Sequence, residues 1–465
     1  MKKKWIIVLI IIFGVLLRLY KINSPLADIS AWRQVDTDSI ARNFLRLKFN
    51  IFYPQLNYDG PPPNYAELEF QLVPFLIALL YKLGGIKVIW ARLVPVVFGA
   101  GSIYLLYLLT REVYDEQTAY LSAFTFAVLP LNIYFQRAVM PESAMIFFSV
   151  GSLYFFDQWI KTERKKDYCW AVFFFAFALL IKLPTGILVL PLFFLAYEKF
   201  GLSLFRRGEI YLFGILTFSP TLIYYFFLHQ IASHTFVSGI AKEQVFSNFF
   251  SSIFESDNLS YVLNIVCHDL LTPIGSILFV AGLIYRRRDK KEVLIYSWTV
   301  AVIVYLLVIV TKIHLEYYVL PLAPVAAILI GKILTVFFKN KDYICLGLVF
   351  ISYLLIQSYQ EIRYYYVLDR EILNRGAEVN SLTPQESLII IDELSPVLLH
   401  ASDRMGWRID RKELTIDLVE ELKNKGADYY VPARTPLSGE IKNYFEENYE
   451  VISTPSGLEI YGLHR

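Results

Sequence analysis

Apolar segments long enough to cross a lipid bilayer recur along the first three quarters of this 465-residue chain. A helical run of about 17–25 apolar residues spans the roughly 30 Å hydrocarbon core of a membrane. Charged residues make up only 18% of the chain, against about 25% in ordinary soluble proteins. The pattern therefore predicts an all-α polytopic membrane protein. It excludes a transmembrane β-barrel, because barrel strands alternate apolar and polar residues and do not give such runs.

Eleven spans are predicted, of which the first lies at the N-terminus. The stretch "MKKKWIIVLIIIFGVLL" begins like a signal peptide, but no small-x-small cleavage site follows it and Arg18 interrupts its end. We therefore interpret it as an uncleaved span. The predicted spans cover residues 5–20, 93–110, 119–136, 143–159, 168–181, 185–199, 210–228, 262–284, 293–310, 318–337 and 343–363.

Basic residues set the predicted orientation, since cytoplasmic loops of membrane proteins are enriched in Lys and Arg. With the N-terminus inside, the cytoplasmic segments hold 18 Lys and Arg, whereas the short outer loops hold 4. This asymmetry requires that "QLVPFLIALLYKLGG" (residues 71–85) does not cross the membrane. Its apolar length of about 14 residues suits an interfacial helix. Residues 21–92 then form one long outer loop that carries juxtamembrane helices.

The composition changes near residue 366. We expect residues 1–365 to form a transmembrane domain and residues 366–465 a small extracytoplasmic α/β domain. "LIIIDE" and "DYYVPA" are typical of buried strands, and "LTIDLVEELKNKG" has the period of an amphipathic helix. "YEVISTPSGLEIYGL" predicts a hairpin whose turn holds Pro455 and Gly457. Eleven spans place this domain outside the plasma membrane.

Acidic and basic side chains gather in the predicted outer loops. Ionisable groups at the edge of the hydrocarbon are costly, and they mark functional sites or paired charges. A carboxylate there can accept a proton from an attacking acceptor, and Lys, Arg or His can neutralise a leaving phosphate. The loops therefore predict group transfer from an amphiphilic donor whose lipid tail lies between the spans. The residues concerned include Asp28, Asp36, Glu67, Glu69, Glu142, Lys182, His314 and Glu316.

The first outer loop, "LRLYKINSPLADISAWRQVDTDSIARNF", resembles that of the GT-C glycosyltransferases. The similarity is to the bacterial relatives of the protein O-mannosyltransferases and to the aminoarabinose lipid A transferases. It continues in family order through "ELEFQLVPFLIALLYKLGG", "ARLVPVVFGAGSIYLLYLLTREVYD", "YFQRAVMPESAMIFF" and "HLEYYVLPLAPVAAILIG", and it covers about residues 1–340. This resemblance implies a GT-C-like fold and an integral membrane enzyme that takes a sugar from a polyprenyl phosphate.

The resemblance also implies roles for individual acidic residues. Asp28 takes the place of the catalytic Asp at the end of the first span. Ile29 stands where the family usually has a second acid, so Asp36 is a second candidate. Glu69 and Glu142 match acidic positions before the interfacial helix and in the second outer loop. Family members generally invert the anomeric centre in one displacement, which implies one base and no covalent sugar intermediate.

The resemblance assigns donor-binding positions as well. Lys182 matches a lysine after the fifth span, and His314, Tyr317 and Tyr318 match the late His/Tyr/Pro motif. We expect Lys182, His314 and Arg33 to hold the donor phosphate. A divalent cation stays an open question, since some relatives need one and others do not.

Each of these residues also has a structural interpretation. Asp28 can cap the helix that follows it, and Asp36 and Asp38 can pair with Arg33 and Arg42. Glu69 can be a surface carboxylate, and Glu142 can serve a helix N-terminus. In the same way His314 can be a solvated loop residue, and Lys182 can extend its amine to the membrane surface.

Three classes of function remain, of which one, a purely structural or sensor protein that presents the α/β domain outside, does not need acidic residues in separate loops. The leading hypothesis is a glycosyltransferase that acts at the outer face on a polyprenyl-phosphate sugar, with a lipid, a glycan or a protein as acceptor. The alternative is a transporter or flippase of lipid-linked sugars, although transporters typically keep polar sites at the membrane midplane. No nucleic-acid partner is expected, because the basic residues are scattered among short loops. The three cysteines suggest neither a disulfide framework nor a zinc site.

Overall fold

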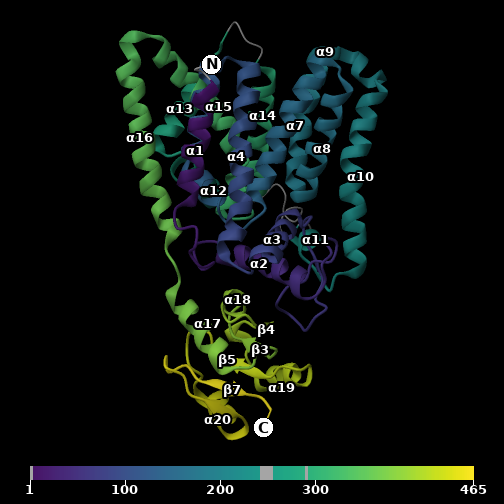
Figure 1. The fold of residues 1–465 in the computed structure, drawn as a ribbon, viewed down its shortest axis with the longest axis vertical. Coiled ribbons are helices and arrows are strands. Elements are labelled where there is room, and N and C mark those ends of the chain that lie inside the picture. Colours follow the sequence, from purple (N-terminus) through teal and green to yellow (C-terminus); the bar gives the residue numbers. More distant parts are fainter. Residues whose placement is uncertain (1–3, 241–254, 288–291, 465) are drawn as a thin grey trace.

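The computed structural model describes residues 4–240, 255–287 and 292–464. Long helices stand side by side in one bundle, and a small α/β unit lies beyond one end of it (Figure 1). The chain begins at the opposite end of the bundle, with α1 (Lys4–Leu19). The last bundle helix, α16 (Ile344–Ile362), leads into the α/β unit.

The predicted spans correspond to single helices or to two or three consecutive helices. Between α1 and α16 these elements are α4 (Val88–Val113), α5 (Glu116–Val128), α6 (Pro130–Phe135), α7 (Glu142–Thr162), α8 (Lys165–Ile181), η1 (Leu183–Leu188), α9 (Val189–Phe200), η2 (Gly201–Arg206), α10 (Gly208–Ile231), α12 (Ser256–Asn264), η5 (Ile265–Leu270), α13 (Pro273–Ile284), α14 (Val293–Tyr305), η6 (Leu306–Val310), η7 (Glu316–Val319), α15 (Leu322–Lys339) and η8 (Lys341–Tyr343).

Among the described residues, six helices are long and apolar enough to cross a membrane, or seven if one bent pair is a single span. The chain is thus an integral membrane protein, but the predicted number of eleven spans is not confirmed. Breaks within predicted spans explain part of the difference, and short helices such as α1, with 16 residues, explain another part. Pro130 divides the span at 119–136 into α5 and α6, because proline has no N–H for an interior helical bond. The span at 262–284 bends by 102° between Leu270 and Pro273.

Two shorter helices, α2 (Ala31–Arg46) and α3 (Leu72–Gly84), lie across the end of the bundle that faces the α/β unit (Figure 1). At 1.5 Å per residue, the 13 residues of α3 reach only about 20 Å, less than the hydrocarbon thickness. This length agrees with the predicted non-spanning helix over residues 71–85. A short parallel bridge joins the same region to the end of α10, through β1 (Ala66–Glu67) and β2 (His234–Thr235), which α11 (Phe236–Ile240) follows.

The α/β unit contains a five-stranded sheet in the order β4-β3-β5-β7-β6. β3 (Leu388–Ile391) pairs in parallel with β4 (Met405–Arg408) and β5 (Tyr429–Val431), and β7 (Ile460–Gly462) pairs antiparallel with β5 and β6 (Glu450–Ile452). The helices of this unit are α17 (Arg370–Leu382), α18 (Val397–Ala401), the short η10 (Arg411–Glu413), α19 (Ile416–Asn424) and α20 (Gly439–Asn448), and η9 (Arg363–Tyr366) precedes them.

The predicted strands at 388–393 and 428–433, the helix ending near Gly426 and the C-terminal hairpin are all present. The edge strand β4 was not predicted, because its sequence Met-Gly-Trp-Arg lacks an apolar run. Gly406 is needed there: its φ is 152°, and a Cβ atom would lie 1.9 Å from the carbonyl oxygen of Ile389. Close packing of β4 against β3 therefore requires glycine at position 406. Glycine is also the residue that interrupts the apolar pattern by which a strand is recognised in the sequence.

Candidate active site

Asp28 lies buried between the end of α1 and the start of α2. Its Oδ2 is 3.2 Å from Nη2 of Arg92 and 3.8 Å from Nη1 of Arg137. Gln34 donates a hydrogen bond to Oδ1. Helix α2 begins at Ala31 with Ser30 as N-cap and without a side-chain cap, so Asp28 does not cap it. Both carboxylate oxygens are held by donors from other segments.

Arg92 and Arg137 were not predicted as site residues. Arg92 donates to Oε1 of Gln34 over 3.2 Å, and Arg137 donates to the carbonyl of Lys21 over 2.8 Å. The guanidinium of Arg137 also lies 4.8 Å from the ring centroid of Tyr366. The sequence signal was the placement of a charge within apolar surroundings, in "IWARLVP" and "YFQRAVMPE". Two buried arginines share one carboxylate, so this part of the site carries excess positive charge.

A second cluster of opposite charges lies beside the first. Arg33 on α2 forms an ion pair with Glu69, which precedes α3. Lys182, at the end of α8, lies 2.7 Å from Oε1 of Glu142 at the start of α7. Burial alone would lower the pKa of Arg33, but the charge of Glu142 together with smaller effects of Tyr317, Asp36 and Tyr318 raises that pKa above its ordinary value. The two ion pairs are therefore close enough to interact.

Tyrosines from η7 adjoin this cluster. The Nζ atom of Lys182 lies 5.1 Å from the ring centroid of Tyr317 and 5.0 Å from that of Tyr318. Lys182 thus contacts a carboxylate and two aromatic faces, which hold its amine inside the cluster. The structure brings together six of the nine predicted site residues: Arg33, Glu69, Glu142, Lys182, Tyr317 and Tyr318.

Asp36 lies one helical turn beyond Arg33 on α2 and is buried. Within the part of the chain that the structure describes, its Oδ1 has no hydrogen-bond partner. Burial raises the pKa of Asp36 to about 6, although the charges of Arg33 and Arg408 act in the opposite direction. A carboxylate with a free oxygen and a pKa near neutrality is suited to exchange a proton with a ligand.

Arg408 of strand β4 comes to this site from the α/β unit. Its Nε and Nη2 lie 3.1 Å and 3.0 Å from the two carboxylate oxygens of Asp59. The guanidinium is 3.8 Å from the ring centroid of Tyr58 and 5.0 Å from that of Trp32. No local pattern in the sequence pointed to Arg408, because its partners belong to the distant first outer loop.

Asp38 belongs to a different network, which joins α2 to the α/β unit. Its Oδ2 is 2.7 Å from Nε of Arg42 and 2.7 Å from Nε2 of His400 on α18. Arg42 and Arg46 bind Asp403 at 3.0 Å and 2.9 Å. The interpretation of Asp38 as a partner of Arg42 is therefore confirmed.

His314 occupies a more exposed position than the cluster residues. Its ring centroid lies 4.3 Å from that of Tyr261, near the end of α12. Glu67, the other acidic residue before α3, is buried, and its carboxylate lies 3.6 Å from Nδ1 of His229.

The acidic residues of the site do not form a metal-binding set. Within residues 4–240, 255–287 and 292–464, no group of three or more His, Cys, Asp or Glu side chains is placed to hold a metal ion. Asp28, Glu69 and Glu142 each face an arginine or a lysine, which already supplies the positive charge. These residues do not fit a divalent cation.

Comparison with known proteins places this geometry in a family context. The family model described as dolichyl-phosphate-mannose-protein mannosyltransferase matches residues 71–224. A protein of Aquifex aeolicus (strain VF5), described only as uncharacterized, is 25% identical over 295 residues. The match covers 63% of this chain and 65% of that protein, so less than two thirds of the relative's length is matched.

Two solved structures share the fold. ArnT from Cupriavidus metallidurans bound to undecaprenyl phosphate superposes with a TM-score of 0.66 at 12% identity, over 100% of this chain and 98% of ArnT. The Archaeoglobus fulgidus oligosaccharyltransferase in complex with Zn and sulfate gives a TM-score of 0.63 at 14% identity, over 98% of this chain and 73% of that protein. The chain thus shares its fold with these two proteins, and its residues 71–224 are similar to the dolichyl-phosphate-mannose-protein mannosyltransferases.

Proposed function

We propose that this protein is an inverting glycosyltransferase that uses a polyprenyl-phosphate-linked sugar donor. Its acceptor is a lipid, a glycan or a protein at the outer face of the plasma membrane. One observation carries the proposal. The ion pairs Arg33–Glu69 and Lys182–Glu142, whose residues come from four different segments, lie together at one end of the bundle. Undecaprenyl phosphate, the ligand bound to the similar ArnT, supports the same class of donor.

The two cations have the chemistry that a leaving phosphate requires. A guanidinium and an ammonium stabilise the negative charge that develops on the phosphate as the sugar leaves. Glu69 and Glu142 hold Arg33 and Lys182 in place and keep both cations charged before the donor enters. We propose that the donor phosphate binds between these cations, with Tyr317 and Tyr318 beside it.

We propose Asp36 as the general base. The acceptor oxygen attacks the anomeric carbon, its proton passes to the carboxylate of Asp36, and the bond between the anomeric carbon and the phosphate oxygen breaks with its electron pair on the phosphate. One displacement of this kind inverts the anomeric centre. The free Oδ1 of Asp36 and its raised pKa support this role.

For Asp28 we propose a different task from the base that the family resemblance implies. Gln34 and Arg92 already occupy its two oxygens. A proton from an acceptor would have to displace one of these donors. Asp28 instead neutralises and orients Arg92 and Arg137, whose positive charge adds to the field around the leaving phosphate.

Purified full-length protein in lipid nanodiscs, supplied with labelled undecaprenyl-phosphate sugars, tests the proposal. We expect release of undecaprenyl phosphate, with the label on an acceptor or in free sugar, and loss of this release in Glu142→Gln. A matched control is Asp157→Asn, which removes another buried carboxylate that pairs with a lysine, Lys161, at 2.6 Å on α7. Binding of the donors without any turnover would contradict the enzyme and support a carrier of lipid-linked sugars.

A further inference from the structure

One cavity lies far from the candidate active site. It has a volume of about 640 Å³ and opens between α9, α14 and the two residues Arg286 and Arg287, which follow α13. From Val293 to Val310, α14 and η6 cover 18 residues, or about 27 Å along the helix axis. Tyr317 of the active site follows beyond that end. The cavity therefore opens near the opposite face of the membrane, which the distribution of basic residues predicts to be cytoplasmic.

Positive charge predominates around this cavity. The carboxylate of Glu292 is satisfied by the buried Lys332 at 2.8 Å and by the hydroxyl of Tyr114 at 2.5 Å. Asp115 pairs with Arg287 at 2.8 Å and with Lys339 at 2.9 Å. With Arg286, these contacts of the described residues bring together four cations and two carboxylates, so that among them two positive charges are in excess.

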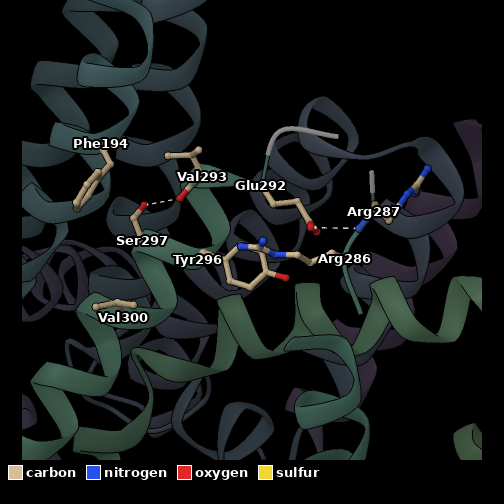
Figure 2. A pocket seen from close by; sticks show the side chains of 8 residues that line it. All are labelled: Phe194, Arg286, Arg287, Glu292, Val293, Tyr296, Ser297 and Val300. Carbon is tan, nitrogen blue, oxygen red and sulfur yellow. Dashed lines mark hydrogen bonds between the residues drawn. The ribbon is translucent and has the colours of Figure 1, made fainter. Parts of the chain in front are cut away.

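Of the cations that the structure describes around the cavity, Arg286 is available to a ligand. Its guanidinium lies over the ring of Tyr296, 5.3 Å from the centroid (Figure 2). No carboxylate of the described residues lies within 4.0 Å of it. An arginine in this state presents planar N–H donors that match the oxygens of a phosphate.

The rest of the wall is apolar and faces the membrane. Phe194 on α9 and Val293 and Val300 on α14 line the cavity (Figure 2). Phe194 is 40% exposed and Val300 is 52% exposed. Polar cations at one end and open apolar helix faces at the other form an amphiphilic surface. Free phosphate would use only the first of these features, whereas a phospholipid would use both.

We propose that this cavity binds the head group of an anionic glycerophospholipid. Arg286 contacts the phosphate over the ring of Tyr296, and the acyl chains lie along the apolar faces of α9 and α14. Anionic lipids of the cytoplasmic leaflet attract basic residues near the membrane surface. The site is separate from the sugar-transfer chemistry and does not depend on it.

Native mass spectrometry of the purified full-length protein in mixed micelles tests the proposal. The probe is phosphatidylglycerol titrated against phosphatidylcholine. We expect selective retention of phosphatidylglycerol, and an apparent affinity about 10-fold or more weaker in Arg286→Gln, the loss expected for one charge-assisted contact. The matched control is Arg206→Gln, which removes another exposed arginine, from η2, outside the cavity.

Two results would overturn the proposal. The first is equal retention of the two lipids. The second is an equal loss in Arg286→Gln and Arg206→Gln, which would indicate a general effect of surface charge. Inorganic phosphate provides a further arm: displacement of phosphatidylglycerol by millimolar phosphate would assign the site to free phosphate instead. Unchanged thermal unfolding of both variants in phosphatidylcholine ensures that any loss of binding is not a loss of fold.

Discussion

Arg408 of β4 binds Asp59 of the first outer loop through two parallel contacts of 3.1 Å and 3.0 Å. A bidentate pair of this kind fixes orientation as well as distance. The same guanidinium packs on Tyr58 and lowers the pKa of the nearby Asp36, against the larger effect of burial. Through Arg408, the α/β unit therefore influences the pKa of the proposed base Asp36.

Turnover should depend on pH through Asp36. Because burial raises its pKa to about 6, the carboxylate is ionised and able to accept a proton only above that pH. We expect an acidic limb of kcat with a midpoint near pH 6. Arg408→Gln removes a positive charge and should move this limb to higher pH, whereas Arg434→Gln, in the same unit, should not. Profiles of kcat against pH for the natural protein, Arg408→Gln and Arg434→Gln measure the shift. Coincident profiles of all three proteins would contradict the prediction.

Asp36→Asn should lower the activity of the protein without lowering its stability. General-base assistance is worth about 10²–10⁴-fold, so kcat should fall by that factor. The raised pKa means that the folded state binds this proton more tightly than the unfolded state. Ionisation of Asp36 therefore lowers the stability of the folded state as the pH rises above about 3.8, the ordinary pKa of an aspartate. At pH 7 the variant should unfold at the same or a higher temperature than the natural protein.

Asp28→Asn should behave in the opposite way. It leaves the buried guanidinium groups of Arg92 and Arg137 without their carboxylate, and breaking a buried pair costs about 3–5 kcal/mol. We expect a lower unfolding temperature and lower yield. Thermal unfolding and kcat of Asp28→Asn and Asp36→Asn, measured side by side, decide between the two residues. A stable Asp28→Asn without turnover, beside an active Asp36→Asn, would make Asp28 the base.

Lys182→Ala should weaken donor binding more than acceptor use. A charge-assisted contact with phosphate contributes about 1.5–3 kcal/mol, or about 10-fold to 100-fold in affinity. Binding of undecaprenyl phosphate in nanodiscs gives the donor affinity directly. Lys161→Ala, which removes a lysine that pairs with Asp157 and is 44% exposed, is the control. Equal donor affinities of the two variants would make Lys182 a residue that only extends to the membrane surface.

Thiol labelling in intact cells checks the proposed orientation. In a cysteine-free background, Ser453→Cys in the α/β unit should react with an impermeant reagent, and Ser203→Cys in η2 should react only after lysis. Both serines are exposed. An outer membrane, where present, is first made permeable. The reverse pattern would invert the topology and move the active site to the cytoplasmic face.

Local sequence patterns were sufficient to predict most helices and the central strands of the α/β unit, whereas the family resemblance was needed to single out residues of the cluster such as Tyr317 and Tyr318. The pairing of the charged residues was not predictable, because Arg33–Glu69 and Lys182–Glu142 depend on how loops fold over one end of the bundle. Arg408 was missed since its role depends on a contact between the two ends of the chain. His314 was expected at the phosphate, but its ring packs on Tyr261.

The first outer loop and the α/β unit also share backbone hydrogen bonds. The N–H of Gly406 donates to the carbonyl of Asn57 over 3.0 Å, and that of Gly60 donates to the carbonyl of Gly406 over 3.2 Å. Since β4 is the edge of its sheet, the loop covers backbone groups that an edge strand otherwise leaves open to self-association. A C-terminal unit transplanted from a relative would meet a loop of the wrong shape, unless residues 57–60 were transplanted with it. The loop and the edge strand are therefore expected to change together in evolution.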